Sequence, residues 1–279
     1  MTVKITWLGT ASYILSLNNV KLLFDPFFSR NEKATPKLMT QKEDISDISG
    51  IFISHGHYDH VCDAGWFAEN LDMPIYCSET AKRNIINWAE GKIIENHIES
   101  LSERAKNNIK ICNFYDKINI SEEITVEVIK SEHIRFDFKT VLSRVFSWQF
   151  LKEAKSLLPY GKGFPKGDVF GFCTFFNEIK IVSFGSLWHK YVEELQKYQL
   201  CDIFLVPYAG NSNKHMVKKT DKMITILQPK IVIPIHWDNF FPPISRIEDL
   251  EPLLKLIARK FPTAEVLIPK FDDEMTVNI

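Results

Sequence analysis

Four side chains that commonly bind metal ions lie within one short stretch of the sequence: His55, His57, Asp59 and His60. The apolar run 50–53 directly before them predicts a short strand. In an extended chain, residues two positions apart point to the same side, so the first two histidines suit one ion. Asp59 and His60 follow the turn that Gly56 permits, and as adjacent residues they must diverge. They therefore suit a second ion beside the first.

The donor types indicate which ions such a site would take. Neutral imidazole and carboxylate favour Zn²⁺, one or two ions, with Mn²⁺ and Fe²⁺ as alternatives. The other interpretation is a surface loop that merely contains histidines. Four donors at ligand spacing favour the metal site over that loop.

The rest of the chain alternates between expected strands and helices. Short runs rich in β-branched and aromatic residues predict strands at 3–7, 13–17, 21–24, 50–53, 74–77, 124–129, 170–176, 179–184, 201–207 and 231–235. Amphipathic segments predict helices at 63–70, 78–90 and 215–227. The pairs Asn18-Asn19 and Asn177-Glu178 are the expected hairpin turns. This alternation is typical of a layered α/β arrangement.

Length and composition indicate one domain, residues 1–279, because 45% hydrophobic residues suffice for a large core. The formal charge is −1, from 34 basic and 35 acidic residues, which argues against nucleic acid as a partner. Neither a signal-peptide pattern nor a stretch of membrane-spanning length is found, so we expect a cytoplasmic protein. The five cysteines form no CxxC pair and are expected to be reduced and mostly buried.

Residues 136–166 are expected to form a helical insertion. Apolar residues recur there at helical spacing, namely Phe138, Val141, Leu142, Val145 and Phe146. Two interpretations stay open: a helix packed on the core or on a partner subunit of a homo-oligomer, and a lid over an apolar substrate pocket. The polar segment 29–45 is expected to be a surface loop at the rim of the site.

The pattern His-x-His-x-Asp-His after an apolar strand resembles the metallo-β-lactamase-fold hydrolases. Three segments narrow the resemblance to the branch that includes the ascorbate-6-phosphate lactonases and the N-acylphosphatidylethanolamine phospholipases: 6–12 (Thr-Trp-Leu-Gly-Thr-Ala-Ser), 24–26 (Phe-Asp-Pro) and 234–237 (Pro-Ile-His-Trp). The resemblance spans the chain from Trp7 to His236. It implies an α/β fold, a four-layer αββα sandwich of two sheets with helices on both outer faces and the metals at one edge.

The resemblance also implies ligands that lie far from this motif. His133 follows the strand 124–129 and takes the position of the third ligand of the first metal. His236 follows the strand 231–235 and takes that of the last ligand of the second metal. Asp25 would support the metal loop from behind the ligands; alternatively, it only ends a strand before Pro26. The implied ligand sets are therefore His55, His57 and His133 for one ion, and Asp59, His60 and His236 for the other.

The sequence departs from the family at Ser186. At this position, after the glycine that follows the strand 179–184, relatives place an aspartate that bridges both metals. A neutral hydroxyl bridges two cations poorly at pH 7. His189 and Asp168 are candidate replacements, and the alternative for both is a solvated surface position.

These residues favour a metal-dependent hydrolase in which a metal-bound hydroxide attacks a small-molecule ester, lactone or phosphodiester. Asp59 is the candidate catalytic residue, which would orient the water or pass its proton to the leaving group. The alternative is a degenerate family member in which Ser186 has led to loss of the second metal, leaving a binding or structural protein. The sequence does not identify the residues that bind substrate; Tyr208 either points into the cleft or is buried with a satisfied hydroxyl.

Overall fold

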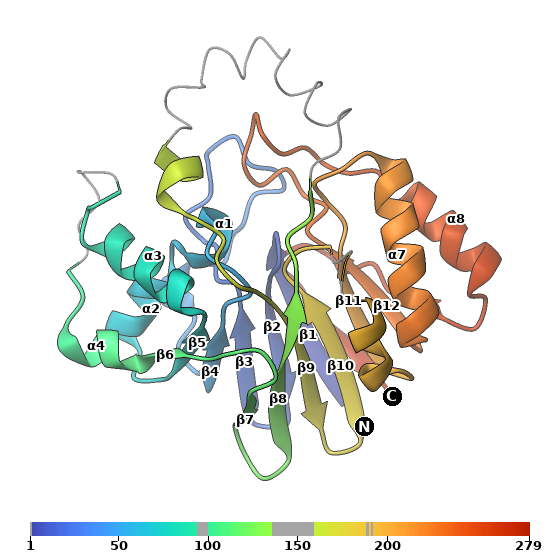
Figure 1. Ribbon diagram of the computed structural model, residues 1–279, viewed down its shortest axis with the longest axis horizontal. Coiled ribbons are helices and arrows are strands. Elements are labelled where there is room, and N and C mark those ends of the chain that lie inside the picture. The colour runs from blue at the N-terminus through green and yellow to red at the C-terminus, as the bar shows by residue number, and fades with distance from the viewer. Residues whose placement is uncertain (1, 94–99, 136–158, 188–189, 191) are drawn as a thin grey trace.

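Two β-sheets lie face to face at the centre of the molecule (Figure 1). The structure is a computed structural model that describes residues 2–93, 100–135, 159–187, 190 and 192–279. The first sheet has seven strands in the order β14-β1-β2-β3-β4-β5-β6, and the second has seven in the order β13-β12-β11-β10-β9-β8-β7. In each sheet, neighbouring strands are antiparallel on one side of the sheet and parallel on the other side.

Ten of the strands correspond to the predicted apolar runs, whereas those at 109–111, 117–119, 265–266 and 274–278 were not predicted. The first sheet consists of β1 (Thr2–Gly9), β2 (Ser12–Leu17), β3 (Val20–Phe24), β4 (Gly50–Phe52), β5 (Ile75–Cys77), β6 (Ile109–Ile111) and β14 (Glu274–Asn278). The second consists of β7 (Lys117–Asn119), β8 (Ile124–Ser131), β9 (Val169–Phe176), β10 (Ile179–Phe184), β11 (Ile203–Pro207), β12 (Ile231–Ile235) and β13 (Glu265–Val266).

A layer of buried side chains fills the space between the sheets. Alternate residues of a strand point to opposite faces, so Val3, Ile5 and Trp7 of β1 enter this layer together. From the other sheet, Ile203 and Leu205 of β11 enter it. Both faces of β11 are covered, which explains why its sequence is continuously apolar, whereas Thr2 and Lys4 of β1 are exposed between its buried residues.

Helices cover the outer face of each sheet (Figure 1). On the first sheet these are α1 (Tyr58–Val61), α2 (Ala64–Asn70), α3 (Glu79–Ala89) and α4 (Glu103–Asn108). On the second they are α7 (Asn213–Leu227) and α8 (Glu251–Lys260), with the 3₁₀ turn η2 (Val192–Tyr198). The predicted four-layer αββα sandwich is thus confirmed.

Local sequence features account for where several elements begin and end. The Ser78 hydroxyl accepts a hydrogen bond from the Ala81 N–H at 3.2 Å and caps α3. Asn18 and Asn177 adopt left-handed backbone conformations, with φ of 52° and 54°, at the two predicted hairpin turns. The predicted 29–45 loop is irregular apart from the short 3₁₀ turn η1 (Lys42–Asp44). Of the predicted helical insertion at 136–166, residues 136–158 lie outside the described residues.

Candidate metal centre

The candidate donors leave the carboxyl ends of strands that share one edge of the sandwich. Asp25 follows β3, the histidine motif follows β4, His133 follows β8, and His236 follows β12. The structure brings six of these side chains into two groups, and within each group the potential ligand atoms lie within 4.8 Å of one another. The groups are His55, His57 and His133, and Asp59, His60 and His236.

The first group consists of three imidazoles. The Nε2 atom of His55 lies 3.1 Å from the Nδ1 atom of His57, and the His133 ring lies 4.5 Å from the His57 ring between centroids. The Nδ1–H of His133 donates to the Ile134 carbonyl at 2.7 Å, which leaves the Nε2 atom of His133 without a proton when the ring is neutral. This group can offer several nitrogen lone pairs to one cation.

The second group contains the carboxylate. An Oδ2 atom of Asp59 lies 3.5 Å from His60 Nε2 and 3.8 Å from His236 Nε2. His236 has φ of 63°, a left-handed conformation at the end of β12, and its Nδ1 atom is buried with no hydrogen-bond partner among the described residues. The rings of His55 and His60 lie 3.9 Å apart between centroids, so the two groups are in direct contact.

Asp25 connects both groups from behind. Its carboxylate accepts hydrogen bonds from the Ser54 N–H and hydroxyl, each at 2.7 Å, and its Oδ2 atom lies 2.9 Å from His60 Nδ1. The Ser54 oxygen lies 3.0 Å from His55 Nδ1 and can accept its proton. Both rings are therefore oriented with Nε2 facing away from this network, the arrangement typical of histidines that bind metal. Asp25 ends β3 as well, with φ of 44°.

These features fit a divalent cation in each group. The hydrogen bonds at Nδ1 leave Nε2 unprotonated in neutral His55, His60 and His133. Burial further disfavours the protonated imidazole: it lowers the pKa of His57 and of His236 to about 4 and that of His133 to about 3.

Ser186 is engaged by the backbone beside His133. Its buried hydroxyl oxygen accepts a hydrogen bond from the Ile134 N–H at 3.0 Å, so it holds the turn that carries a candidate ligand. Asp168 is exposed and belongs to neither donor group, in agreement with the interpretation that it is a solvated surface residue. His189 lies outside the described residues.

Tyr208 and Cys62 have no direct part in either group. Tyr208 is buried among the side chains under α7 and α8, so the interpretation that it points into the cleft is wrong. Its hydroxyl has no hydrogen-bond partner among the described residues, so the expectation of a satisfied hydroxyl is not met either. Cys62 is buried, and its Sγ atom lies 3.4 Å from the Asp63 carboxylate.

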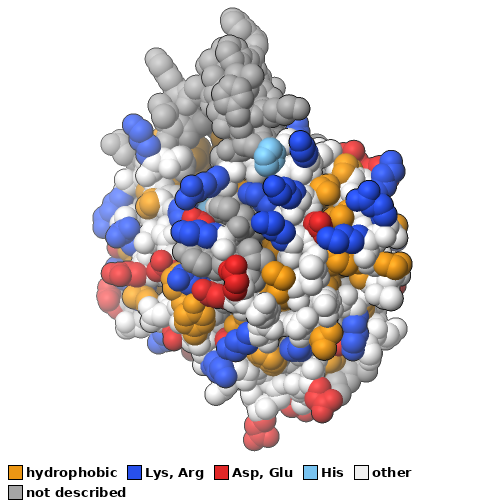
Figure 2. All heavy atoms as spheres, turned by 45° about the vertical axis from the view of Figure 1, so that its right-hand side comes forward, with side chains coloured by type: hydrophobic (Ala, Val, Ile, Leu, Met, Phe, Trp, Pro, Cys, Tyr) orange, Lys and Arg blue, Asp and Glu red, His pale blue; other side chains and the backbone are white. Residues whose placement is uncertain are grey.

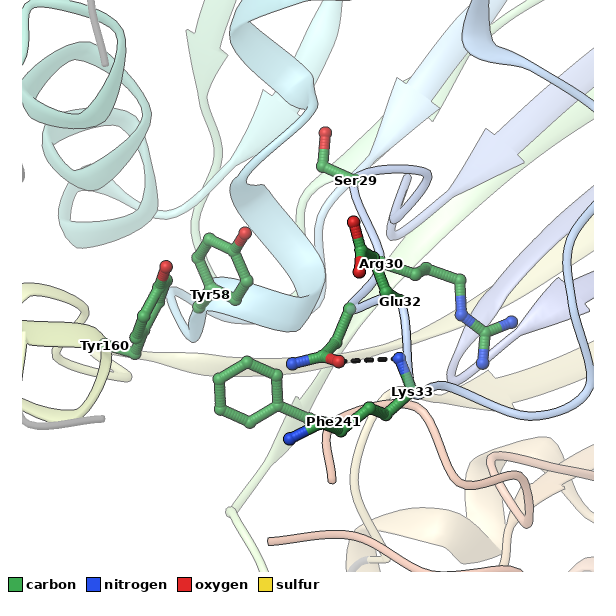
Figure 3. Close-up of a pocket in the computed structure, with 8 residues that line it drawn as sticks. Ser29, Arg30, Glu32, Lys33, Tyr58, Tyr160 and Phe241 are labelled. Atoms are coloured by element: carbon green, nitrogen blue, oxygen red, sulfur yellow. Dashed lines mark hydrogen bonds between the residues drawn. The ribbon is translucent and has the colours of Figure 1, made fainter. Parts of the chain in front are cut away.

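A cavity of about 450 Å³ is lined by Tyr58, a residue of the histidine motif (Figure 3). Residues 29–33 form one side of it, and Tyr58, Tyr160 and Phe241 form the other. Tyr58 lies in the chain between two candidate ligands, His57 and Asp59. The 29–45 loop was predicted at the rim of the site, but this pocket was not predicted. The only local indication of the pocket was the aromatic residue inside the histidine motif.

Buried ion pairing holds this loop against the segment that follows His236. The Arg30 guanidinium pairs with Asp238, whose other oxygen accepts a hydrogen bond from the Thr10 N–H at 2.8 Å. Both side chains are almost fully buried, at 5% and 0% exposed. Asp63 anchors the start of the same loop by accepting hydrogen bonds from the N–H groups of Phe28 and Ser29. These residues position the loop and the ligand segment relative to each other, and no sequence pattern predicted them.

Gly185 is required by close packing behind the donors. A Cβ atom added there would lie 2.6 Å from the Ser54 Cβ and 2.7 Å from an Asp25 carboxylate oxygen. We expect Gly185→Ala to lower the free energy of unfolding by about 1–3 kcal/mol, as overpacking typically does, and to weaken metal binding about 10- to 100-fold by displacing the Asp25 network.

Urea unfolding and metal titration measure these two effects. Gly65→Ala is the matched control, because its added Cβ would come no closer than 3.4 Å to any neighbour. The double variant Gly185→Ala, Ser54→Gly restores room for the new methyl group and should recover part of the lost stability. Unchanged stability of the single variant would contradict the packing argument.

The surface carries charges of both signs. On the face shown in Figure 2, Lys and Arg side chains are intermixed with Asp, Glu and hydrophobic side chains. Within the described residues, no helix is both long and apolar enough to cross a membrane.

Comparison with known proteins places this geometry in context. The family model of the metallo-beta-lactamase superfamily matches residues 5–129. The UPF0173 metal-dependent hydrolase of Pyrococcus abyssi is 25% identical over 273 residues, covering 98% of this chain and 99% of the relative. The corresponding protein of Pyrococcus horikoshii is 26% identical over 275 residues, again covering 98% and 99%.

Solved structures share the same fold. A novel metallo hydrolase from the archaeon Ignicoccus hospitalis superposes with a TM-score of 0.66 at 15% identity, over 100% of both chains. The isothiocyanate hydrolase from Delia radicum gut bacteria superposes with a TM-score of 0.61 at 17% identity, over 98% of both chains. At these identities the likeness concerns the fold.

Proposed function

We propose that this chain, whose residues 5–129 match the family model of the metallo-beta-lactamase superfamily, is a metal-dependent hydrolase of a small ester, lactone or phosphodiester. The observation that supports this most is the meeting of two donor groups at one sheet edge, in ring contact through His55 and His60 and beside a cavity. The names of the full-length relatives, metal-dependent hydrolases, agree with it.

The donor chemistry favours Zn²⁺, with Mn²⁺ and Fe²⁺ as alternatives. A bound cation lowers the pKa of a water molecule and stabilises negative charge that develops on a carbonyl or phosphoryl oxygen. In this proposal one cation is held by His55, His57 and His133, and the other by Asp59, His60 and His236.

Asp59 is the proposed catalytic residue. Burial acts to raise the pKa of this carboxyl group, but the neighbouring imidazoles of His60, His236 and His57 outweigh it and lower the pKa overall. Asp59 is therefore a carboxylate at neutral pH. From its position between the two histidines of its group, an oxygen of this carboxylate can accept a proton from the attacking water and return it to the leaving group.

Asp25 and Ser54 are proposed to keep the donors in one orientation. Burial acts to lower the pKa of His60, but Asp59 and Asp25 outweigh it and raise the pKa. A cation in the second group would be attracted by the same two carboxylates. The preset rings reduce the reorganisation that binding requires.

Elemental analysis of protein purified without chelator or added metal tests the proposal. We expect at least one equivalent of metal per chain, and two equivalents if both donor groups bind an ion although Ser186 replaces the bridging aspartate. Treatment with a chelator should abolish hydrolysis in a panel of esters, lactones and phosphodiesters, and metal should restore it. Metal-free protein that hydrolyses a substrate at the same rate would contradict the metal-dependent mechanism.

The second candidate is a binding or structural protein with one metal or none. It is favoured by Ser186, whose neutral oxygen already accepts the Ile134 N–H and carries no charge to offset two cations. Metal content and hydrolysis of Ser186→Asp separate the candidates. A gain of one equivalent together with new turnover would indicate a site that has lost its activity; no change would indicate that the serine is part of a working site.

A further inference from the structure

The cavity has an aromatic wall of three rings, two of which belong to segments that carry candidate ligands. Tyr58 lies within the histidine motif. Phe241 follows Phe240, whose ring packs against the His236 ring at 4.8 Å between centroids. A group bound against Tyr58 and Phe241 would therefore be attached to atoms that lie close to the candidate metal ligands.

The three rings of this wall contact one another. The ring centroids are 4.6 Å apart for Tyr58 and Tyr160, 5.5 Å for Tyr160 and Phe241, and 5.9 Å for Tyr58 and Phe241. Trp88 and Phe164 pack against the Tyr58 ring at 5.4 and 5.2 Å and support it from behind. Figure 3 shows Tyr58 and Tyr160 side by side, facing the loop across the cavity.

The opposite wall is polar and carries both charge signs. It includes Ser29, Asn31, Glu32 and Lys33, and the Asn31 side chain accepts a hydrogen bond from the Lys33 N–H at 2.8 Å, drawn as the dashed line in Figure 3. The guanidinium of Arg30 points away from the tyrosines in this view, toward its partner Asp238. Glu32 and Lys33 offset each other, so this wall favours an uncharged ligand with hydrogen-bonding groups.

We propose that this cavity is the recognition subsite for a planar aromatic group of an uncharged substrate, and that Tyr160 and Phe241 determine the preference for aromatic over alkyl groups. The volume of about 450 Å³ is in the range of sites for small organic molecules. Aromatic rings bind one another through edge and offset contacts that saturated rings of the same size cannot make. The substrate class rests on the proposed function, while binding to the cavity does not.

Binding of two size-matched, hydrolysis-resistant amides to the metal-free full chain tests the proposal: N-benzylacetamide and N-(cyclohexylmethyl)acetamide. We expect the benzyl compound to bind about tenfold more tightly in calorimetric or NMR titrations, as two or more ring contacts imply. Tyr160→Leu and Phe241→Leu should abolish this ratio, whereas Tyr160→Phe should retain it. Tyr115→Leu, at an exposed tyrosine outside the cavity, is the matched control and should also retain it.

Equal binding of the two amides to the wild-type protein would overturn the proposal, whether or not either leucine variant folds. A ratio that persists in both folded leucine variants would overturn the role of these rings. The readout also separates the two proposals. A tenfold ratio without hydrolysis of any ester, lactone or phosphodiester in the panel would support the subsite and contradict the hydrolase. Hydrolysis without the ratio would support the hydrolase and contradict the subsite.

Discussion

His55→Ala is expected to remove the metal of the first donor group and to reduce hydrolysis to background. The side chain is 1% exposed, its Nε2 atom faces His57, and its ring packs on His60. Its removal therefore takes a contact from both donor groups. Loss of the metal-dependent stabilisation of the transition state, about 4 kcal/mol or more, corresponds to a decrease in kcat/KM of about 10³-fold.

Elemental analysis and kinetics on the purified variant measure this result. His215→Ala is the matched control: this histidine is exposed on α7 and belongs to neither group, so metal content and turnover should stay at the wild-type level. Circular dichroism of both variants establishes that the fold is retained. A folded His55→Ala protein with full metal content and full activity would exclude His55 as a ligand.

Acidification from pH 7 to pH 5 is expected to destabilise the metal-free protein by roughly 4–6 kcal/mol. Burial lowers the pKa values of His57 and His236 from 6.5 to about 4 and that of His133 to about 3, and it lowers the pKa of His55 well below 6.5. An unfolded chain binds protons at these residues near pH 6.5, whereas the folded chain resists until the pH approaches 4. Unfolding therefore takes up protons, and the free energy of unfolding decreases as the pH is lowered across this window.

The magnitude follows from counting protons. Each depressed histidine costs up to about 2 kcal/mol between pH 7 and pH 5. His60 acts in the opposite direction because its pKa is raised, so its stabilisation is present at low pH and lost as the pH rises through its folded pKa. Between pH 7 and pH 5 this offset is smaller than the contribution of one depressed histidine, because the unfolded chain also takes up most of a proton at this residue.

Urea unfolding in the presence of a chelator, repeated at pH 7, 6 and 5, measures this slope. His133→Asn should make the slope shallower by the contribution of about one proton, because the depressed imidazole is gone. His215→Asn, at the exposed histidine of α7, should leave the slope unchanged. A free energy of unfolding that is the same at pH 7 and pH 5 would show that the donor histidines are not buried in neutral form.

The sequence alone was sufficient for the layered fold and for the position of the donors along it. The runs of β1 and β8, which alternate apolar and polar residues, and the continuously apolar run of β11 are local patterns, and the latter already implies a strand covered on both faces. The candidate donors follow such runs. Parallel pairing brings the carboxyl ends of β3 and β4 to one edge, whereas β8, which is antiparallel to both neighbours, brings His133 to the same group. The spacing of His55 and His57 is likewise a local property of an extended chain.

Only the tertiary structure decided which side chains support those donors and what lies beside them. Ser186 accepts a hydrogen bond from Ile134, 52 residues earlier, and Arg30 pairs with Asp238 across 208 residues. The cavity combines residues 29–33 with Tyr58, Tyr160 and Phe241. No local pattern encodes such contacts, because they depend on how the sheets and loops pack in three dimensions, and the sequence therefore specifies them only through the completed fold.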